Sequence, residues 1–282
     1  MLKRIFAFPI TRLVSIVVLF GALLTPAVLL SHPHSSRQTI AFTWFAALLL
    51  TAVTLVVERF AAGESAARVG LGLRLAARDA ALGLLLGAAL FSCVVFELAI
   101  GGFYRIVAVH VTPALGVAAL LFIGDALLEE LLFRGVIFRL VEEWTGTWIA
   151  LIVSGALFGF AHAANPHATL VSSLAIALEA GVLLGGAFVL VRNLWFPIGI
   201  HFAWNFFEGP VFGTQVSGHA LGSSAVSSYV TGPPAITGGA FGPEAGIPAM
   251  ITCLVVAAVL LVLAVRAGRT RAPSWRLRIG AA

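Results

Sequence analysis

Residues 113–143 read PALGVAALLFIGDALLEELLFRGVIFRLVEE, an apolar run that is long enough to cross a bilayer as a helix and yet carries several charges. Asp125, Glu129, Glu130 and Arg134 lie along its second half. An ionisable residue at the centre of a bilayer costs about 2.5–3.5 kcal/mol on insertion scales, so four in one span require pairing or a wet cavity. We therefore interpret this stretch as the functional centre of the chain.

Helical geometry separates the two adjacent glutamates. At about 100° per residue, Glu130 and Arg134 lie one turn apart on the same face and can form an i,i+4 ion pair. Glu129 points away from Arg134 by more than a right angle. The spacing therefore predicts a neutralised Glu130 and a free Glu129.

The composition is typical of a polytopic membrane protein. The 282 residues are 60% hydrophobic and 10% charged, with a mean hydropathy of +1.06 and a net charge of +5 at pH 7. A soluble domain of this length cannot bury so large an apolar fraction. The basic residues flank apolar segments instead of forming one patch, which indicates topology signals and argues against nucleic acid as a partner.

Hydropathy predicts an all-α fold of about eight transmembrane helices in one membrane domain, residues 1–282. The expected spans are 13–31, 39–57, 80–100, 113–143, 147–162, 169–191, a seventh after Asn193, and 247–265. The first is interpreted as an uncleaved anchor, since no convincing small-residue cleavage site follows its basic start.

Three segments between or after the spans have a different composition. Residues 61–79 are polar and are expected to hold a short interfacial helix. Residues 208–248 are rich in Gly, Ser and Pro, which indicates a loop at the membrane surface or over the site. Residues 266–282 are predicted to form a basic cytoplasmic tail.

The basic residues are distributed asymmetrically about these spans. Nearly all of them fall on the side of the two termini, and only Arg37 and Arg105 fall on the other. The positive-inside rule therefore predicts that both termini are cytoplasmic. Cys93 and Cys253 lie within apolar spans and indicate neither a disulfide nor a zinc framework.

Three separate helices place polar groups at a similar depth in the membrane. These groups are Glu129, Glu130 and Arg134 on the fourth span, His162 on the fifth, and His201 and Asn205 on the seventh. They are expected roughly 12–22 Å from the cytoplasmic ends of their helices, so they can meet in one layer. A glutamate and a histidine can activate a water to attack a carbonyl carbon, while a second histidine and an amide stabilise the oxyanion. The pattern indicates peptide-bond hydrolysis without a covalent enzyme intermediate.

These residues form three short motifs, EELLFR at 129–134, FGFAH at 158–162 and HFAWN at 201–205. They resemble the motifs EExxxR, FxxxH and HxxxN of the CPBP or Abi family, which comprises the intramembrane CAAX prenyl proteases and their bacterial relatives linked to bacteriocin processing and immunity. The motif core covers about 110–210, roughly a third of the chain.

The resemblance implies a CPBP-type intramembrane glutamic endopeptidase whose helices surround a conical, water-filled cavity. The implied roles are water activation by Glu129 and His162, an oxyanion hole of His201 and Asn205, and support by Glu130 and Arg134. It further implies no cofactor, a membrane protein or peptide as substrate, and a place in the bilayer of a bacterial cytoplasmic membrane.

Two other interpretations remain open. Glu129, His162 and His201 could serve as zinc ligands of a metal-dependent protease, although the chain has no HExxH motif. Buried acids and histidines also suit a transporter, or an immunity protein that binds a peptide without cutting it. The spans hold three further acids without an assigned role, Glu97, Asp125 and Glu179.

Overall fold

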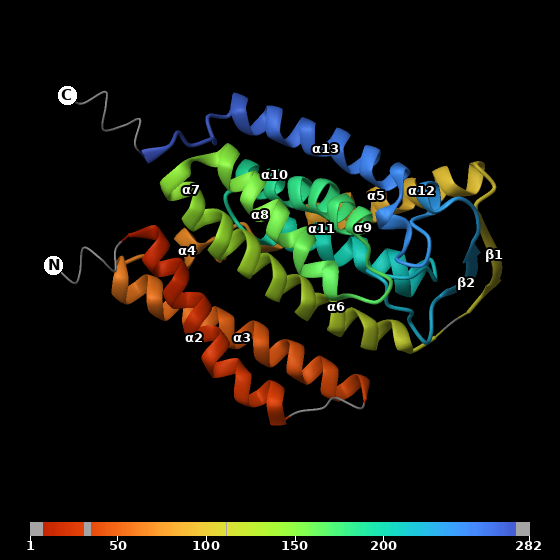
Figure 1. Ribbon diagram of the computed structural model, residues 1–282, viewed down its shortest axis with the longest axis horizontal. Helices are drawn as coiled ribbons and strands as arrows, with labels where there is room; N and C mark the ends of the chain where they lie inside the picture. Colours follow the sequence, from red (N-terminus) through yellow and green to blue (C-terminus); the bar gives the residue numbers. More distant parts are fainter. Residues whose placement is uncertain (1–7, 31–34, 111, 275–282) are drawn as a thin grey trace.

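The computed structural model describes residues 8–30, 35–110 and 112–274, and the regular structure in this part of the chain is almost entirely helical (Figure 1). It begins with the long helices α2 (Pro9–Leu30), α3 (Ser36–Ala61) and α5 (Ala76–Ile100). The short helix α4 (Ala66–Val69) connects α3 to α5. It lies in the polar segment where the sequence predicted an interfacial helix.

The charged stretch forms one continuous helix in three parts. α6 (Ala114–Glu130) passes into the π-helical segment η1 (Leu131–Phe138), which continues as α7 (Arg139–Thr145). π-Helical turns are rare and occur frequently at functional sites. Here the wider turn begins directly after the two glutamates and contains Arg134.

Four further helical segments cross the bundle. They are α8 (Thr147–Ala161) with the 3-10 turn η2 (His162–Ala164), α9–η3–α10 (Leu170–Ile176, Ala177–Gly181 and Val182–Val191), α11–η4 (Trp195–Phe206 and Phe207–Val211), and α13 (Ile247–Arg266). Among the described residues, six helices are long and apolar enough to cross a membrane. The charged helix α6–η1–α7 and the shorter α11–η4 occupy the other two predicted spans. The prediction of an all-α polytopic membrane protein is confirmed.

The apolar core lies where η1, α7, α10 and α11 meet. Leu131, Phe138, Leu140, Phe188 and Leu194 are buried there. The rings of Phe138 and Phe188 meet edge to face with their centroids 5.6 Å apart. These large side chains hold the charged helix against its neighbours.

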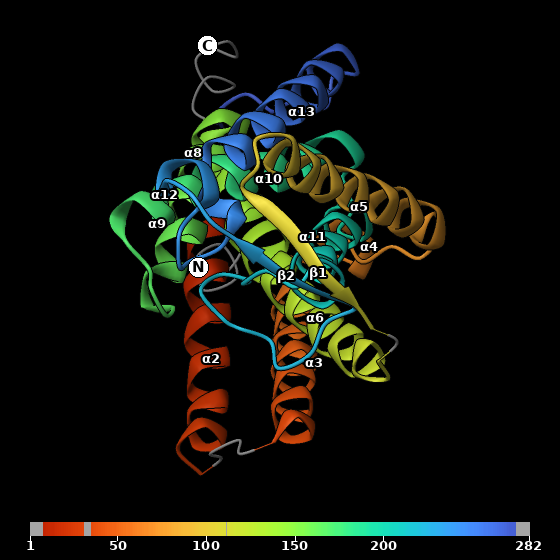
Figure 2. The same ribbon diagram turned by 90° about the vertical axis from the view of Figure 1, so that its right-hand side faces the viewer.

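A small antiparallel sheet, which the sequence did not predict, lies at the end of the bundle where α5 ends. β1 (Tyr104–Val109) follows α5 and pairs with β2 (Val226–Val230), with Tyr104 opposite Val230 (Figure 2). β1 occupies the connection after the third span, which carries Arg105, and β2 lies inside the Gly-rich stretch. The two strands are far apart in the chain, so neither stretch alone carries a signal for their pairing.

The Gly-rich stretch 208–248 packs on the bundle. It begins inside η4, and beyond β2 it contains α12 (Pro234–Thr237) and η5 (Pro243–Ala245). Its glycines permit close backbone contacts: a Cβ on Gly218, which has φ of +83°, would lie 1.8 Å from the Pro166 carbonyl oxygen. The composition that indicated a loop therefore supports a compact, folded segment.

Both ends of the described chain contact the same residue. The ring of Phe8 lies 6.1 Å from that of Trp144, and the Ser274 hydroxyl donates to the Trp144 carbonyl at 2.9 Å. Buried ion pairs join the helices at this end, since Glu58 accepts from both Arg12 and Arg139 at 2.7 Å. The two ends therefore lie on one side of the bundle, and that this side is cytoplasmic stays a prediction.

Cysteine labelling of intact cells tests this orientation. In a Cys93→Ala, Cys253→Ala background, we expect Arg74→Cys to react only after the membrane is made permeable, because α4 and its flanks are predicted to face the cytoplasm. Arg105→Cys, at the sheet, should react from outside without permeabilisation. The reverse pattern at the two positions would contradict the predicted topology.

Candidate active site

Glu130 and Arg134 form a fully buried ion pair in the charged helix. Arg134 Nη1 donates to Glu130 Oε1 at 2.7 Å, and both side chains are 0% exposed. Arg134 Nη2 donates to the Ala180 carbonyl of η3 at 3.0 Å, and the guanidinium carbon lies 4.5 Å from the centre of the Phe158 ring. The i,i+4 ion pair predicted from the sequence is therefore present, and it also joins three helices.

His201 lies between the two glutamates. α11 packs against both α5 and α6, which brings His201 Nδ1 to 2.9 Å from Glu130 Oε1 and His201 Nε2 to 3.8 Å from Glu129 Oε2. The Glu129 side chain is 32% exposed, whereas Glu130 is completely buried. Glu129 is thus the more accessible carboxylate, as its position on the other face of the helix predicted.

The His162 ring is oriented by its own helix. His162 follows the last residue of α8, and its Nδ1 lies 2.8 Å from the Phe158 carbonyl oxygen. A carbonyl oxygen only accepts hydrogen bonds, so Nδ1 carries the proton and Nε2 of the neutral ring holds a free lone pair. Phe158 also packs against both histidines, with ring centroids 4.8 Å from His162 and 5.9 Å from His201.

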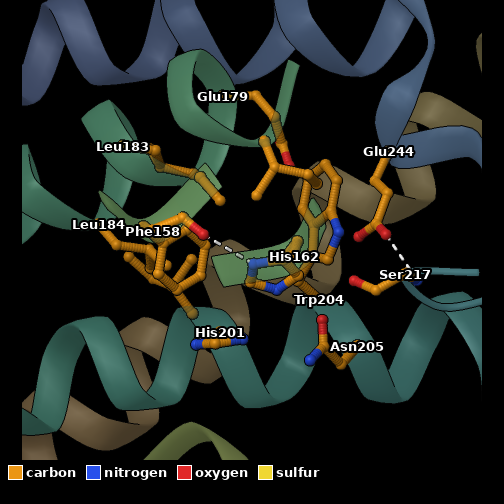
Figure 3. A pocket seen from close by; sticks show the side chains of 13 residues that line it. Phe158, His162, Glu179, Leu183, Leu184, His201, Trp204, Asn205, Ser217 and Glu244 are labelled. Carbon is orange, nitrogen blue, oxygen red and sulfur yellow. Dashed lines mark hydrogen bonds between the residues drawn. The ribbon is translucent and has the colours of Figure 1, made fainter. Parts of the chain in front are cut away.

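A cavity with about 380 Å³ of empty space, including its open side, lies beside these groups (Figure 3). His162 from the end of α8 faces His201 and Asn205 on α11, and all three line the cavity. Its apolar wall is formed by Phe158, Ile176, Leu183, Leu184, Ile200 and Trp204. Glu129 and Glu130 do not line the cavity themselves. Both lie next to His201, which does line it.

Three lining residues with acidic or hydroxyl side chains had no predicted role: Glu179 of η3, Ser217 and Glu244. The backbone N–H of Ser217 donates to Glu244 Oε1 at 2.6 Å, and burial raises the pKa of the Glu244 carboxyl. An acid in a nearly uncharged stretch was the one sequence signal that marked Glu244. The segment between the last two spans therefore closes one side of the cavity.

The other two acids without an assigned role, Glu97 and Asp125, do not line the cavity. Glu97 accepts from Thr252 Oγ1 at 3.1 Å on the outer surface between α5 and α13. Asp125 lies on α6 one turn before Glu129 and is partly buried. Only Glu179 of the three acids without an assigned role lines the cavity.

The histidines and acids do not fit a metal site in the described part of the chain. No three His, Cys, Asp or Glu side chains there are grouped so that they could hold a metal ion. The zinc ligands considered from the sequence, Glu129, His162 and His201, are therefore not arranged as a ligand set.

The fold and these groups define a polytopic membrane protein with a buried polar site among its helices. Residues 110–207, which contain all six motif residues, match a family model described as type II CAAX prenyl endopeptidase Rce1-like. The match covers the part of the chain that holds the motifs and confirms that this part is similar to the CAAX protease family. No curated protein and no solved structure matches the chain.

Proposed function

We propose that the protein is an intramembrane endopeptidase that hydrolyses a peptide bond with a water activated by Glu129 and His162. The observation that carries the proposal is the position of His201, which contacts both glutamates and shares a cavity with His162 and Asn205. Three motifs from separate helices thus adjoin one space. The family match supports a CAAX-type peptidase that acts on membrane-associated peptides or proteins.

In the first step a water attacks the carbonyl carbon of the scissile bond. The water oxygen forms the new C–O bond while Glu129, assisted by the free Nε2 of His162, takes its proton. In the second step the tetrahedral intermediate expels the amine, and the C–N bond breaks as the stored proton passes to the leaving nitrogen. The products are a carboxylic acid and an amine, and no covalent bond to the enzyme forms.

His201 and Asn205 are proposed to stabilise the negative oxygen of the intermediate. His201 donates its Nδ1 proton to Glu130, so it needs a proton on Nε2 to serve the oxyanion. The positive charge of that ring would be balanced by the two neighbouring carboxylates. Asn205, one turn further along α11, would supply an amide N–H from the same face.

Mass spectrometry of cells tests this function. Peptides or membrane proteins from cells that carry the wild-type chain are compared with those from cells that carry Glu129→Gln. A substrate should accumulate uncut in the variant, and its cleavage product should be present only with the wild type. Identical peptide profiles in the two strains would contradict the hydrolytic function.

Asn205→Ala is expected to lower kcat by about 10²–10³, because loss of one oxyanion donor has that effect in other enzymes. Substrate affinity should change little, since the donor acts mainly in the transition state. Single-turnover rates on the identified substrate measure the effect. Asn205→Asp should be slower still, because it sets a negative acceptor against the forming oxyanion.

His201→Ala serves as the matched variant for the metal-dependent alternative. A zinc enzyme would lose bound metal in His201→Ala and would depend little on Asn205. Metal content is therefore measured for both variants and the wild type. An unchanged kcat in Asn205→Ala would remove the oxyanion role.

A further inference from the structure

A second pocket lies at the end of the bundle where both ends of the described chain meet. It has about 850 Å³ of empty space, including its open mouth. Five arginines line it: Arg68, Arg139, Arg192, Arg269 and Arg271. They come from α4, from the start of α7 and from the segments that directly follow α10 and α13, so four parts of the chain contribute to one basic pocket.

Part of this positive charge is balanced within the protein. Arg139 pairs with Glu58 at 2.7 Å and with Glu143 at 3.0 Å. Arg192 binds both oxygens of Glu142, with Nη1 at 2.5 Å from Oε2 and Nη2 at 3.0 Å from Oε1. The charges of these two guanidinium groups are therefore balanced by carboxylates of the protein.

The remaining charge is not balanced. Arg271 shares Glu142 with Arg192 at a longer distance of 3.7 Å. Arg68 is 68% exposed and makes a long contact of 3.4 Å with Glu64. The exposed Arg269 side chain has no ion-pair partner among the described residues. The mouth of the pocket therefore carries an excess of cationic side chains that could bind an anion.

We propose that this pocket binds the phosphate group of an anionic phospholipid headgroup. Its lining residues include Phe188 on the last turn of α10 and the residues just beyond the end of α13, so it lies where membrane spans end and headgroups begin. Arginine forms paired, parallel hydrogen bonds with phosphate oxygens, and basic pockets between spans bind anionic headgroups. The proposed contacts are Arg68 and Arg269, the two exposed lining arginines that make no ion pair with a buried carboxylate in the described part of the chain.

Lipid retention by the purified full-length protein tests the proposal. After partial delipidation, native mass spectrometry compares phosphatidylglycerol with phosphatidylcholine on the wild type and on Arg68→Ala/Arg269→Ala. We expect the wild type to retain phosphatidylglycerol preferentially and the double variant to bind it about 30-fold more weakly, at about 1 kcal/mol for each arginine and 1.4 kcal/mol for each factor of ten.

The control is Arg74→Ala, which removes an exposed arginine on the same side of the membrane but outside the pocket and should retain lipid as the wild type does. Arg68→Lys/Arg269→Lys keeps the charges, so it should fall between wild type and double variant even if the alanine variant is poorly folded. Equal phosphatidylglycerol retention by the wild type and both double variants would overturn the proposal. Displacement of phosphatidylglycerol by an equal concentration of inorganic phosphate would contradict the proposal that the pocket binds a lipid headgroup, because free phosphate would then bind equally well.

Discussion

Replacement of Glu129 by glutamine is expected to abolish peptide hydrolysis while the protein stays folded. Glutamine has nearly the same shape as glutamate but cannot take a proton from water, and a positioned general base contributes about 10²–10⁴ to the rate. The Glu129 side chain is partly exposed, and its Oε2 has no hydrogen-bond partner among the described residues and lies 3.8 Å from His201 Nε2. In Glu129→Gln, the closer carboxylate of Glu130 still pairs with His201. Loss of its charge should therefore cost little stability.

The measurement combines rate and stability on the same preparation. kcat is determined with the substrate that accumulates in cells, and Tm is determined by thermal unfolding in detergent. Glu97→Gln is the matched control, because it removes an intramembrane carboxylate on the outer surface between α5 and α13. It should leave kcat unchanged. Equal kcat for Glu129→Gln and the wild type would exclude Glu129 as the base.

The same comparison separates an enzyme from a non-catalytic membrane protein. In a proton relay or a peptide-binding scaffold, Glu129→Gln would change transport or binding and no cleaved product would exist in either strain. In the proposed endopeptidase, the variant should still bind the substrate that it no longer cuts. Copurification of the uncut substrate with Glu129→Gln, together with its cleaved product in wild-type cells, is therefore the result expected of an enzyme.

Local sequence signals were sufficient for the spans and for the Glu130–Arg134 pair. Each span is a continuous apolar run, and the pair depends only on i,i+4 spacing within one helix. The Glu130–His201 contact could not be predicted from spacing, because it depends on how α11 packs against α6. That contact is the physical basis for the proposed supporting role of Glu130, which would be to orient the histidine of another motif.

The sequence was least informative where the chain pairs with distant segments. β1 and β2 are separated by more than a hundred residues, so neither the sheet nor the position of Ser217 and Glu244 on the cavity follows from local composition. The Gly-rich stretch lacked periodicity because its glycines serve close backbone contacts, as at Gly218. Low complexity here reflects tight turns and not the absence of structure.

Arg134→Ala is expected to reduce the stability of the protein as well as its activity. Removal of one partner of a buried ion pair strands the other charge and costs about 3–5 kcal/mol. Here Glu130 would be left completely buried, and the Ala180 carbonyl would lose its donor. Glu130→Ala should have a similar effect by stranding Arg134. Tm and the yield of monodisperse protein on size exclusion measure both variants.

The loss of stability is expected to depend on the charge that is left unpaired in the interior of the bundle. The double variant Glu130→Gln/Arg134→Met removes both charges at similar volume, and replacement of a whole buried pair by neutral groups is often tolerated. It should therefore be more stable than Arg134→Ala, yet it should stay inactive because His201 loses its charged partner. Arg105→Ala, an exposed arginine on β1, should leave Tm unchanged. A wild-type Tm for Arg134→Ala would show that the Glu130–Arg134 pair is not required for stability. The orientation of His201 by Glu130 would then be the one remaining role proposed for the pair.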